Sequence, residues 1–470
     1  MTPQKPQDLI RDKMVNEGCN GPIIESFINS VKKVQNGVTG LISDTDISGN
    51  IEIPSLESIS VEGYSSKAPL ESLAVIKLNG GLGTGMGLDK AKSLLPIKGH
   101  DCFLDFIARQ ILHLRQVSRT KFPRFLLMNS FSTQEDSLRY LNKYPELKNA
   151  GQLDFLQNKV PKISAETLTP AEYRQNRELE WCPPGHGDIY PSMVASGIID
   201  ELLTQGIRYL FVSNSDNLGA TVDLDILGYF ADSGLSFLME VASRTSSDKK
   251  GGHLAKRKDG RLILREKAQC PPEESDSFQN IEKYKYFNTN SIWIFLPDLK
   301  EALEKNGGFL ELPLIRNHKT INPKEASSEA VYQLESAMGA AIECFDKSNA
   351  LLVPRSRFAP VKTTNDLLSI KSDAYQVSSD YTLKLAPQRN GIPPEIKLDE
   401  RFYKKVDDFD RLIPGSPPSL IDCETFQVTG PVKMDESSKM SGVVTIHSRD
   451  NSVCPALLSP GEYSNGEFEI

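Results

Sequence analysis

Residues 73–87 read LAVIKLNGGLGTGMG, a largely aliphatic run that leads directly into a turn with five glycines in eight residues. Continuous apolar runs of this kind are typical of strands buried on both faces of a sheet. The glycines lack Cβ atoms and permit positive φ angles, so successive backbone amides can surround an anion closely. The stretch predicts a buried strand that ends in a loop suited to a triphosphate.

Two common nucleotide-binding motifs are excluded by the spacing of these glycines. A dinucleotide fingerprint requires glycine at a position where this chain has Met86 or Leu88. A Walker A loop requires glycine directly before a Lys-Ser pair, and here Ala91 precedes Lys92-Ser93. The loop therefore belongs to neither the dinucleotide-binding class nor the P-loop class.

Short apolar runs alternate with helix-length segments over the middle of the chain. We expect helices at residues 103–117 and 192–205, and strands at residues 73–78, 125–128, 209–212, 237–241, 261–264, 291–296 and 350–353. This alternation predicts an α/β fold with a mostly parallel sheet covered by helices on both faces. Ligands of such sheets bind at the carboxyl ends of the strands, where the glycine-rich loop is expected.

A chain of 470 residues exceeds the usual size of one hydrophobic core, so at least two domains are expected. Residues 1–70 combine apolar positions at helical spacing with an irregular polar connector. Residues 71–375 hold the predicted sheet. Residues 376–470 contain short β-rich pieces separated by Gly and Pro, which predicts a small β domain, either a stacked β-helix or a sandwich.

The composition excludes several classes of protein. Hydrophobic residues make up 39% and charged residues 25%, as in ordinary globular proteins, and a net charge of −8 argues against wrapping of nucleic acid. No run approaches the roughly 18 apolar residues of a membrane span, and the first residues lack the apolar core of a signal peptide. The seven cysteines are scattered, which favours free thiols. We expect a cytoplasmic protein that binds neither membranes nor nucleic acid.

The turn and the Lys-Ser pair after it resemble the nucleotide-binding signature of eukaryotic-type UTP:glucose-1-phosphate uridylyltransferases, also called UDP-glucose pyrophosphorylases. Further blocks that resemble this family, in the family's order, lie at residues 183–188, 213–220, 250–252, 287–290 and 354–362. The resemblance covers nearly the whole chain. It implies a Rossmann-like, GT-A-like nucleotidyltransferase with a mixed sheet flanked by helices, a helical N-terminal segment and a C-terminal β-helix-like domain.

The resemblance implies transfer of the uridylyl group of UTP to glucose 1-phosphate, which gives UDP-glucose and pyrophosphate by in-line attack without a covalent intermediate. A phosphate monoester has its second pKa near 6, so the attacking oxygen is ionised at pH 7 and needs no general base. The protein has to align two phosphates and reduce their repulsion, which calls for lysines, donated amides and a divalent cation. We expect Mg²⁺ in this role.

By the same resemblance, two lysines and one aspartate carry the catalytic charges. Lys92 follows the turn closely enough to fold back over the nucleotide phosphates, and Lys90 is its nearest competitor. Lys362 follows an apolar strand and would neutralise charge on the transferred phosphate. Asp216 lies just past another predicted strand and is the expected Mg²⁺ ligand, because Mg²⁺ prefers carboxylate oxygens.

The remaining site residues are implied by the resemblance as a whole. The nucleotide is expected to contact Leu78, Asn79, Gly80, Gly81, Lys92, Gln157, Gly185 and Asp216, with the amide of Gln157 distinguishing uracil from cytosine. The sugar phosphate is expected to contact His186, Asn214, Ser215, Gly252, Glu266, Asn288 and Asn290. His186 is assigned to binding because the nucleophile needs no base. Asn288 and Asn290 would point to the same side of an extended strand.

Three other functions remain open. UDP-sugar or UDP-N-acetylhexosamine pyrophosphorylases share the chemistry, but they resemble a motif with arginine where this chain has Gly85. A metal-dependent glycosyltransferase would use a DxD motif, which residues 223–225 match, although this segment reads as a helix start. A non-catalytic regulator would not need Lys92, Asp216 and Lys362. In some members of the family the C-terminal domain mediates self-association, so it is a candidate for that role here.

Overall fold

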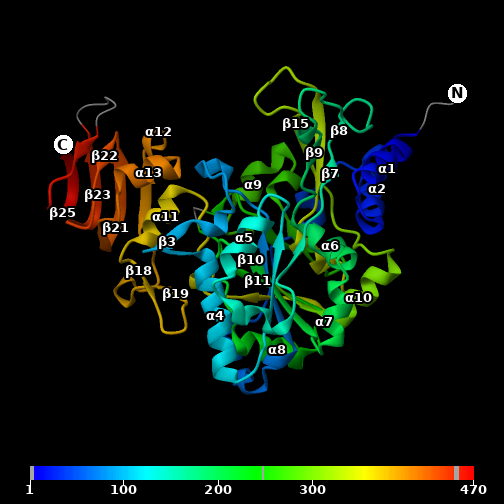
Figure 1. Cartoon of the computed structure of the whole chain (residues 1–470), viewed down its shortest axis with the longest axis horizontal. Helices are drawn as coiled ribbons and strands as arrows, with labels where there is room; N and C mark the ends of the chain where they lie inside the picture. Colours follow the sequence, from blue (N-terminus) through cyan, green and yellow to red (C-terminus); the bar gives the residue numbers. More distant parts are fainter. Residues whose placement is uncertain (1–4, 246–247, 449–454) are drawn as a thin grey trace.

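The computed structural model of the chain describes residues 5–245, 248–448 and 455–470. Cys454 and the first four residues lie outside this part, and the other six cysteines are free thiols. A pair of helices lies at one end of the molecule, a large sheet covered by helices lies in the centre, and parallel strands lie at the other end (Figure 1). Within these residues, no helix is both long and apolar enough to cross a membrane.

The central sheet has ten strands among the described residues. The order along it is β1, β12, β14, β10, β2, β5, β6, while β11 pairs with β14 and β17, and β13 pairs with β12. The strands are β1 (Ile47–Ser48), β2 (Leu73–Asn79), β5 (Arg124–Asn129), β6 (Asp154–Leu156), β10 (Tyr209–Asn214), β11 (Phe237–Ser243), β12 (His253–Arg257), β13 (Leu262–Arg265), β14 (Tyr286–Phe295) and β17 (Ser348–Leu352). All seven predicted strands occur, and β14 begins at Tyr286 rather than at residue 291.

The sheet is mixed, which confirms the mixed sheet implied by the resemblance, whereas the mostly parallel sheet expected from the alternation of strands and helices is wrong. Strands β2, β5, β6 and β10 are parallel, as are β11 and β17, but β14 runs antiparallel to both β10 and β11. A strand buried on both faces is apolar whichever way it runs, so the apolar pattern carries no information about direction. The parallel group still brings the ends of β2, β10 and β5 to one edge.

Helices cover both faces of the sheet, as predicted. Along β2, Val75 packs on one face with α4 (Phe103–Ser118) and α8 (Leu224–Ser233). Its neighbour Ile76 packs on the other face with α6 (Ile189–Ala195), α7 (Ile198–Thr204) and α10 (Leu296–Lys305). Figure 1 shows β10 and β11 between these two groups of helices. The alternation follows from the two-residue period of a strand.

The segment at residues 192–205 is not the single helix that its pattern predicts. It is divided between α6, which begins at Ile189, and α7, which begins at Ile198. Gly197 between them has φ +71°, a left-handed conformation that ends a helix and that glycine adopts without steric cost.

The N-terminal segment is helical as expected. Helices α1 (Pro6–Asn16) and α2 (Gly21–Gln35) bury Ile10 and Phe27 against residues of the central part such as Val160 and Leu334. The connector after them contains more structure than its polar sequence indicates, because β1 joins the central sheet and α3 (Leu56–Val61) packs against α8.

Short pairings complete the central part. They are β3 (Pro96–Lys98) with β4 (Asp101–Cys102), β7 (Val160–Pro161) with β9 (Trp181–Cys182), β18 (Tyr375–Val377) with β19 (Leu383–Leu385), and β16 (Ala330–Glu335) with both β8 (Ile163–Ser164) and β15 (Ile315–Thr320). The remaining helices are α5 (Gln134–Leu141), α9 (Ser275–Gln279), α11 (Thr364–Lys371), α12 (Glu400–Tyr403) and α13 (Val406–Leu412). Helices α11 to α13 lead from the central sheet to the C-terminal strands.

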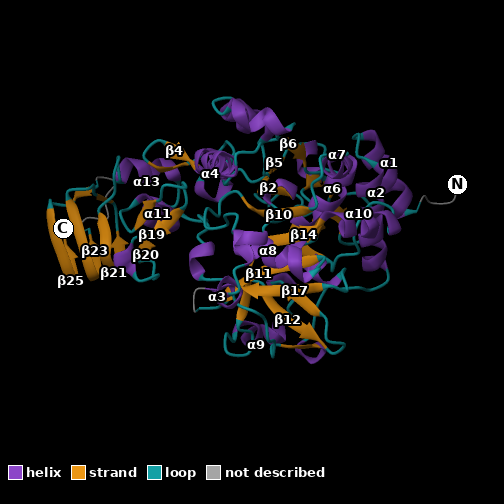
Figure 2. Cartoon of the chain, turned by 90° about the horizontal axis from the view of Figure 1, so that it is seen from below, coloured by secondary structure: helices purple, strands orange, loops and turns teal. Residues whose placement is uncertain are grey.

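The C-terminal strands stack in parallel. The sheet order is β20 (Glu395–Leu398), β21 (Ser419–Thr429), β23 (Ser438–His447) and β25 (Gly461–Glu469), with a second parallel pair of β22 (Val432–Lys433) and β24 (Ala456–Leu457). Figures 1 and 2 both show β21, β23 and β25 side by side. Successive parallel strands favour the β-helix prediction over the sandwich, whose sheets are antiparallel.

Helix α8 packs closely against the connector at Gly228. A Cβ atom at Gly228 would lie 2.0 Å from the carbonyl oxygen of Tyr64, whereas one at Gly21, the first residue of α2, would have no neighbour within 4 Å. We expect Gly228→Ala to lower the free energy of unfolding by about 1–3 kcal/mol because backbone has to shift. Gly21→Ala should change it by less than about 0.5 kcal/mol. Equal midpoints of urea denaturation for the two variants would contradict this packing.

Candidate functional site

The glycine-rich turn begins where β2 ends, between its parallel neighbours β10 and β5. The side chain of Asn79 is buried here and bonds only to protein: its Nδ2 donates to Asn129 Oδ1 (2.7 Å) and Ser137 Oγ (2.8 Å). Its Oδ1 accepts from Ser215 Oγ (3.1 Å), and Ser215 N donates to Leu78 O (3.0 Å). Asn79 and Ser215 therefore hold the ends of two strands together and leave the backbone of the turn to face a ligand.

The turn folds back on itself and returns Lys92 to the end of the sheet. Lys92 N donates to Gly81 O (3.1 Å), and a Cβ atom at Gly81 would have open space around it. The ammonium of Lys92 then lies 2.5 Å from Asp216 Oδ2, and both side chains are largely buried. The structure thus brings together the two charged residues that the sequence places 124 positions apart.

Lys362 reaches the same edge because its loop is joined to the loop that carries Asp216. Val361 N donates to Asp216 O (3.2 Å), and Asn217 pairs with Pro360 as an isolated bridge. The side chain of Lys362 is exposed, and Thr363 behind it caps α11. Lys92, Asp216 and Lys362 therefore lie on adjacent loops at the carboxyl edge of the sheet.

A buried ion pair supports these loops from below. Nε and a terminal nitrogen of Arg357 each lie 2.7 Å from a carboxylate oxygen of Glu240 on β11. Lys77 on β2 donates to Ser213 Oγ (2.7 Å) and Ala220 O (2.6 Å). Burial, with repulsion from Arg357, lowers the pKa of Lys77 to about 7. Arg357 therefore holds the loop that leads to Lys362 in place against β11.

Gln157 lies against the turn. A Cβ atom at Gly80 would come within 2.5 Å of Gln157 Oε1, so only glycine leaves room for the amide. The next residue, Asn158, donates from its backbone N (2.6 Å) and its Nδ2 (2.9 Å) to the carboxylate of Asp188. Burial raises the pKa of Asp188 to about 6 although these hydrogen bonds oppose the rise. Asp188 thus holds the Gln157 segment in place, a contact that sequence reasoning missed.

His186 lies next to Gly185, whose φ of +80° and lack of a side chain let the backbone approach Ser336. Met338 N donates to His186 Nδ1 (2.9 Å), so Nδ1 is an acceptor and the proton of the neutral ring is on Nε2. Burial lowers the pKa of His186 to about 4. The ring is therefore neutral at pH 7 and can donate one hydrogen bond, which suits binding.

Four of the six other expected sugar residues, Gly252, Glu266, Asn288 and Asn290, meet at the ends of β12, β13 and β14. Asn288 N donates to Gly252 O (3.1 Å), and a Cβ atom at Gly252 would lie 2.5 Å from Glu266 Oε2. Asn288 Nδ2 donates to Asn290 Oδ1 (2.7 Å). Burial raises the pKa of Glu266, and the charge of Lys362 opposes the rise, which indicates that this carboxylate faces the Lys362 loop.

The two amides of Asn288 and Asn290 lie together, but not for the expected reason, because the strand is not extended there. Asn290 has φ +58°, and the register between β11 and β14 shifts so that Val241 pairs with Asn288 and Glu240 with Ser291. This is a β-bulge, which redirects side chains. The bulge, rather than a two-residue period, brings the two amides together. Asn214 ends β10, opposite Leu78.

Lys405 is a further residue at the turn that the sequence gave no reason to select. It precedes α13 in the C-terminal part, and its side chain lies along Gly87, where a Cβ atom would be 2.9 Å from Lys405 Cδ. The contact joins residues more than 300 positions apart. No local pattern marks such a contact, since Lys405 reads as an ordinary loop residue.

The DxD segment forms a helix start. Asp223 Oδ1 accepts from the backbone N of Asp225 (3.0 Å) and Ile226 (3.2 Å) and so caps α8, and Asp225 Oδ1 accepts from Ser65 N (2.9 Å). Both carboxylates are engaged in holding the fold. Among the described residues, no group of three or more His, Cys, Asp or Glu side chains is arranged to hold a metal ion. Asp216 therefore remains the candidate ligand for a metal that is held mainly by phosphates.

Comparison with known proteins gives a consistent result. The family model described as UTP--glucose-1-phosphate uridylyltransferase matches residues 27–440. The chain is 38% identical over 430 residues to the UTP--glucose-1-phosphate uridylyltransferase of Solanum tuberosum, covering 90% of this chain and 88% of that protein. It is 41% identical over 401 residues to a protein of Schizosaccharomyces pombe described as a probable UTP--glucose-1-phosphate uridylyltransferase, covering 85% and 78%.

Solved structures agree along the whole length. The crystal structure of a UDP-glucose phosphorylase from Trypanosoma brucei is 46% identical, with a TM-score of 0.89 and 99% of each chain covered. A mutant UDP-glucose pyrophosphorylase from Leishmania major in complex with UDP-glucose is 43% identical, with a TM-score of 0.92, covering 99% of this chain and 100% of that one. The chain belongs to the UTP--glucose-1-phosphate uridylyltransferase family.

Proposed function

We propose that the chain transfers the uridylyl group of UTP to glucose 1-phosphate and releases pyrophosphate. The observation that carries this proposal is the meeting of Lys92, Asp216 and Lys362 on adjacent loops beside an open glycine-rich turn. The reaction joins two anions, so its barrier is largely electrostatic, and cations beside donated amides are the groups that lower it. Release of pyrophosphate from UTP and glucose 1-phosphate, with UDP-glucose as the second product, tests the proposal.

Each part of the site has a share in this reaction. The turn and Lys92 bind the phosphates of UTP, and the amide of Gln157 hydrogen-bonds to the uracil ring. Glu266, Asn288 and the neutral His186 hydrogen-bond the sugar. Lys362 neutralises charge on the phosphate under attack, and the fixed positions of both substrates supply the in-line geometry. No side chain takes a proton, because the sugar phosphate is already ionised.

We propose Mg²⁺ as the metal. Asp216 fits it because its Oδ2 faces Lys92 while the carboxylate remains partly exposed at the edge of the turn. One carboxylate with phosphate oxygens and water is a typical Mg²⁺ environment. When bound, the ion would withdraw charge from the phosphates.

The alternatives are less well supported. A glycosyltransferase would need its DxD carboxylates free for a metal, and both are engaged in capping α8 and its contact with Ser65. A broader UDP-sugar pyrophosphorylase differs only in the sugar subsite. Rates with galactose 1-phosphate or N-acetylglucosamine 1-phosphate equal to the rate with glucose 1-phosphate would favour that function.

Two properties of the whole chain belong to the same proposal. We place the protein in the cytoplasm, since its described cysteines are free thiols, as a reducing compartment requires.

We also propose self-association through residues 376–470. In the described structure β25 pairs with β23 alone, so its other edge offers backbone groups to a second copy. Residues 1–70, 71–375 and 376–470 are the domains on which this proposal rests.

Lys362→Ala should lower kcat by roughly 100- to 1000-fold, since one charge-stabilising contact in a transition state is worth about 3–4 kcal/mol. The side chain is exposed, so the melting temperature should stay unchanged. Lys305→Ala is the control, because Lys305 is an exposed lysine of α10 that pairs with Glu301. Turnover near the wild-type value in Lys362→Ala would remove this residue from the mechanism.

Gln157→Ala should raise the KM for UTP and increase the use of CTP relative to UTP, because the amide that distinguishes the two rings is lost. Steady-state kinetics with both nucleotides measure the ratio. Gln205→Ala, at the residue directly after α7 where Gln205 bonds to Glu201, is a matched glutamine control. An unchanged CTP to UTP ratio in Gln157→Ala would show that another group reads the base.

Removal of divalent metal with EDTA should abolish pyrophosphate release, and added Mg²⁺ should restore it. Asp216→Asn should raise the Mg²⁺ concentration for half-maximal activity at least about tenfold, because the amide is a weaker ligand than a carboxylate. Titration of activity with Mg²⁺ checks both outcomes. Full activity in EDTA would contradict the metal requirement.

A further inference from the structure

The ends of three strands fix the candidate sugar subsite. His253 at the start of β12 pairs with Arg265 at the end of β13 and with Phe287 of β14. The neighbouring residues along each strand are Gly252, Glu266 and Asn288, the expected sugar contacts. A hexose presents hydroxyl groups in fixed directions, so these contacts work only if the three strand ends keep their register. The groups behind the subsite therefore matter for substrate binding.

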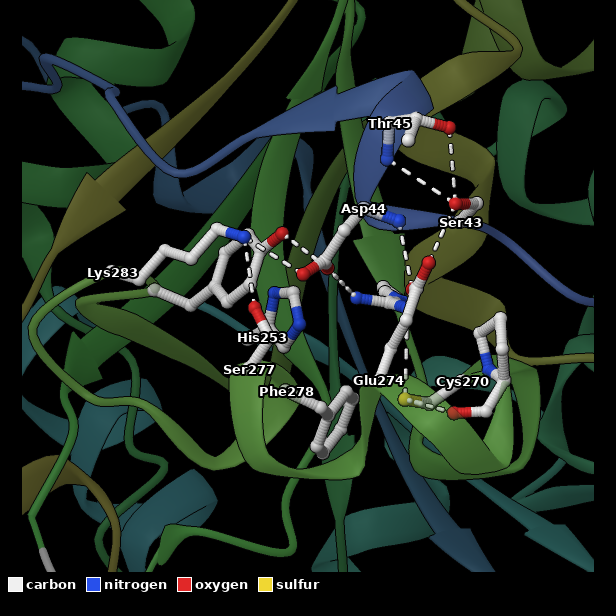
Figure 3. Close-up of polar contacts among 12 residues, drawn as sticks. Ser43, Asp44, Thr45, His253, Cys270, Glu274, Ser277, Phe278 and Lys283 are labelled. Carbon is white, nitrogen blue, oxygen red and sulfur yellow. Dashed lines mark hydrogen bonds and ion pairs between the residues drawn. The ribbon is translucent and has the colours of Figure 1, made fainter.

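Behind Glu266, the side chain of Arg265 is fully buried between two carboxylates. One terminal nitrogen donates to Asp44 Oδ1 (2.5 Å), and the other donates to Glu274 Oε2 (2.6 Å). Figure 3 shows Asp44 and Glu274 converging from two different segments. A guanidinium held by two carboxylates has a fixed plane, so the strand end that carries it is fixed as well.

Asp44 belongs to the connector that precedes the central sheet, more than 200 positions from Arg265. Its carboxylate also accepts from Lys283 Nζ (2.7 Å) and Tyr284 OH (2.8 Å), as Figure 3 shows for Lys283. Its backbone N donates to Glu274 Oε2 (2.8 Å). Burial raises the pKa of Asp44, but these hydrogen-bonded partners outweigh burial and hold the pKa well below its usual value.

The network also reaches the strand that carries Gly252. The ring of Tyr284 stacks on His253 with centroids 3.8 Å apart, and His253 is fully buried. One side of the subsite is therefore held through the bond from Tyr284 to Asp44, and the other side is held through the bonds of Arg265. Both supports end on the same connector aspartate.

We propose that Asp44, Arg265 and Glu274 are positioning residues for the sugar phosphate: they hold the end of β13 so that the carboxylate of Glu266 stays against Gly252. The inference rests on the proposed function. It assigns the connector at residues 43–44 a part in the binding of glucose 1-phosphate, although the connector does not touch the substrate. Loss of this support would let the carboxylate of Glu266, which accepts hydrogen bonds from the sugar hydroxyls, move out of place. The contacts to the nucleotide would stay unchanged.

Asp44→Asn and Arg265→Lys test the proposal in the full-length enzyme. The first variant keeps the shape and removes the charge, and the second keeps the charge but cannot bridge two carboxylates. Each should raise the KM for glucose 1-phosphate about tenfold and lower the preference for glucose 1-phosphate over galactose 1-phosphate. The KM for UTP and kcat should stay within about twofold. Ser43→Ala, which removes the 2.6 Å bond to Glu274 together with the local bonds of the hydroxyl to Thr45, should produce a smaller shift in the same direction.

Arg124→Lys is the control. Arg124, the first residue of β5, is as fully buried as Arg265 and pairs with Glu201 of α7. The variant should lower the melting temperature and leave both KM values unchanged. Unchanged KM for glucose 1-phosphate in Asp44→Asn and Arg265→Lys, or an equal rise for both substrates, would overturn the proposal. If the two variants do not fold, the same comparison of the KM for glucose 1-phosphate with the KM for UTP is made with Ser43→Ala. An inactive wild-type chain would instead refute the proposed function, and the positioning role would fall with it.

Discussion

The ion pair between Arg357 and Glu240 is the interaction on which the catalytic edge depends. It lies wholly inside the fold, and it fixes the loop of residues 355–362 to β11. Asn217 Nδ2 donates to Arg357 O (3.2 Å), and a Cβ atom at Gly219 would lie 2.5 Å from Ser356 O, so the loop after β10 is held against the same segment. Removing one partner of such a pair leaves an uncompensated buried charge, at a cost of about 3–5 kcal/mol. The positions of Asp216 and Lys362 thus follow from a pair that is buried in the fold behind them.

Residues that hold the site and residues that face the ligand are distinct along most of this edge. The side-chain amide of Asn79 is hydrogen-bonded to Asn129, Ser137 and Ser215. The carboxylate of Asp188 accepts hydrogen bonds from Asn158 and Ser192. Such saturated groups restrain the glycine-rich turn and the Gln157 segment. The turn itself presents backbone, which cannot rotate away from an anion as a side chain can. A site that works by charge and alignment, without proton transfer, needs this rigidity more than it needs reactive groups.

The sequence was sufficient for the elements that have local signals. The strand at residues 73–78, the turn after it and α4 are marked by apolar runs and glycine, and the structure has them within two residues. The direction of β14 was not predictable, because a strand buried on both faces is apolar in either direction. Residues in the matching blocks, such as His186 and Asn288, could be selected by resemblance, and so could Gln157, which matches the family's uracil-reading glutamine outside those blocks. Asp44 and Lys405 could not, since their contacts join distant segments and leave no pattern in either one.

The ion pair between Lys92 and Asp216 links the nucleotide to the metal in the proposed reaction. Only 15% and 20% of these side chains are exposed, so either charge alone would be costly, and each compensates the other at 2.5 Å. A triphosphate offers the lysine several anionic oxygens, and a divalent cation offers the carboxylate twice the charge of the lysine. A nucleotide without metal would draw Lys92 away and leave Asp216 facing phosphate, where like charges repel. The pair therefore favours a metal-bound nucleotide over a free one.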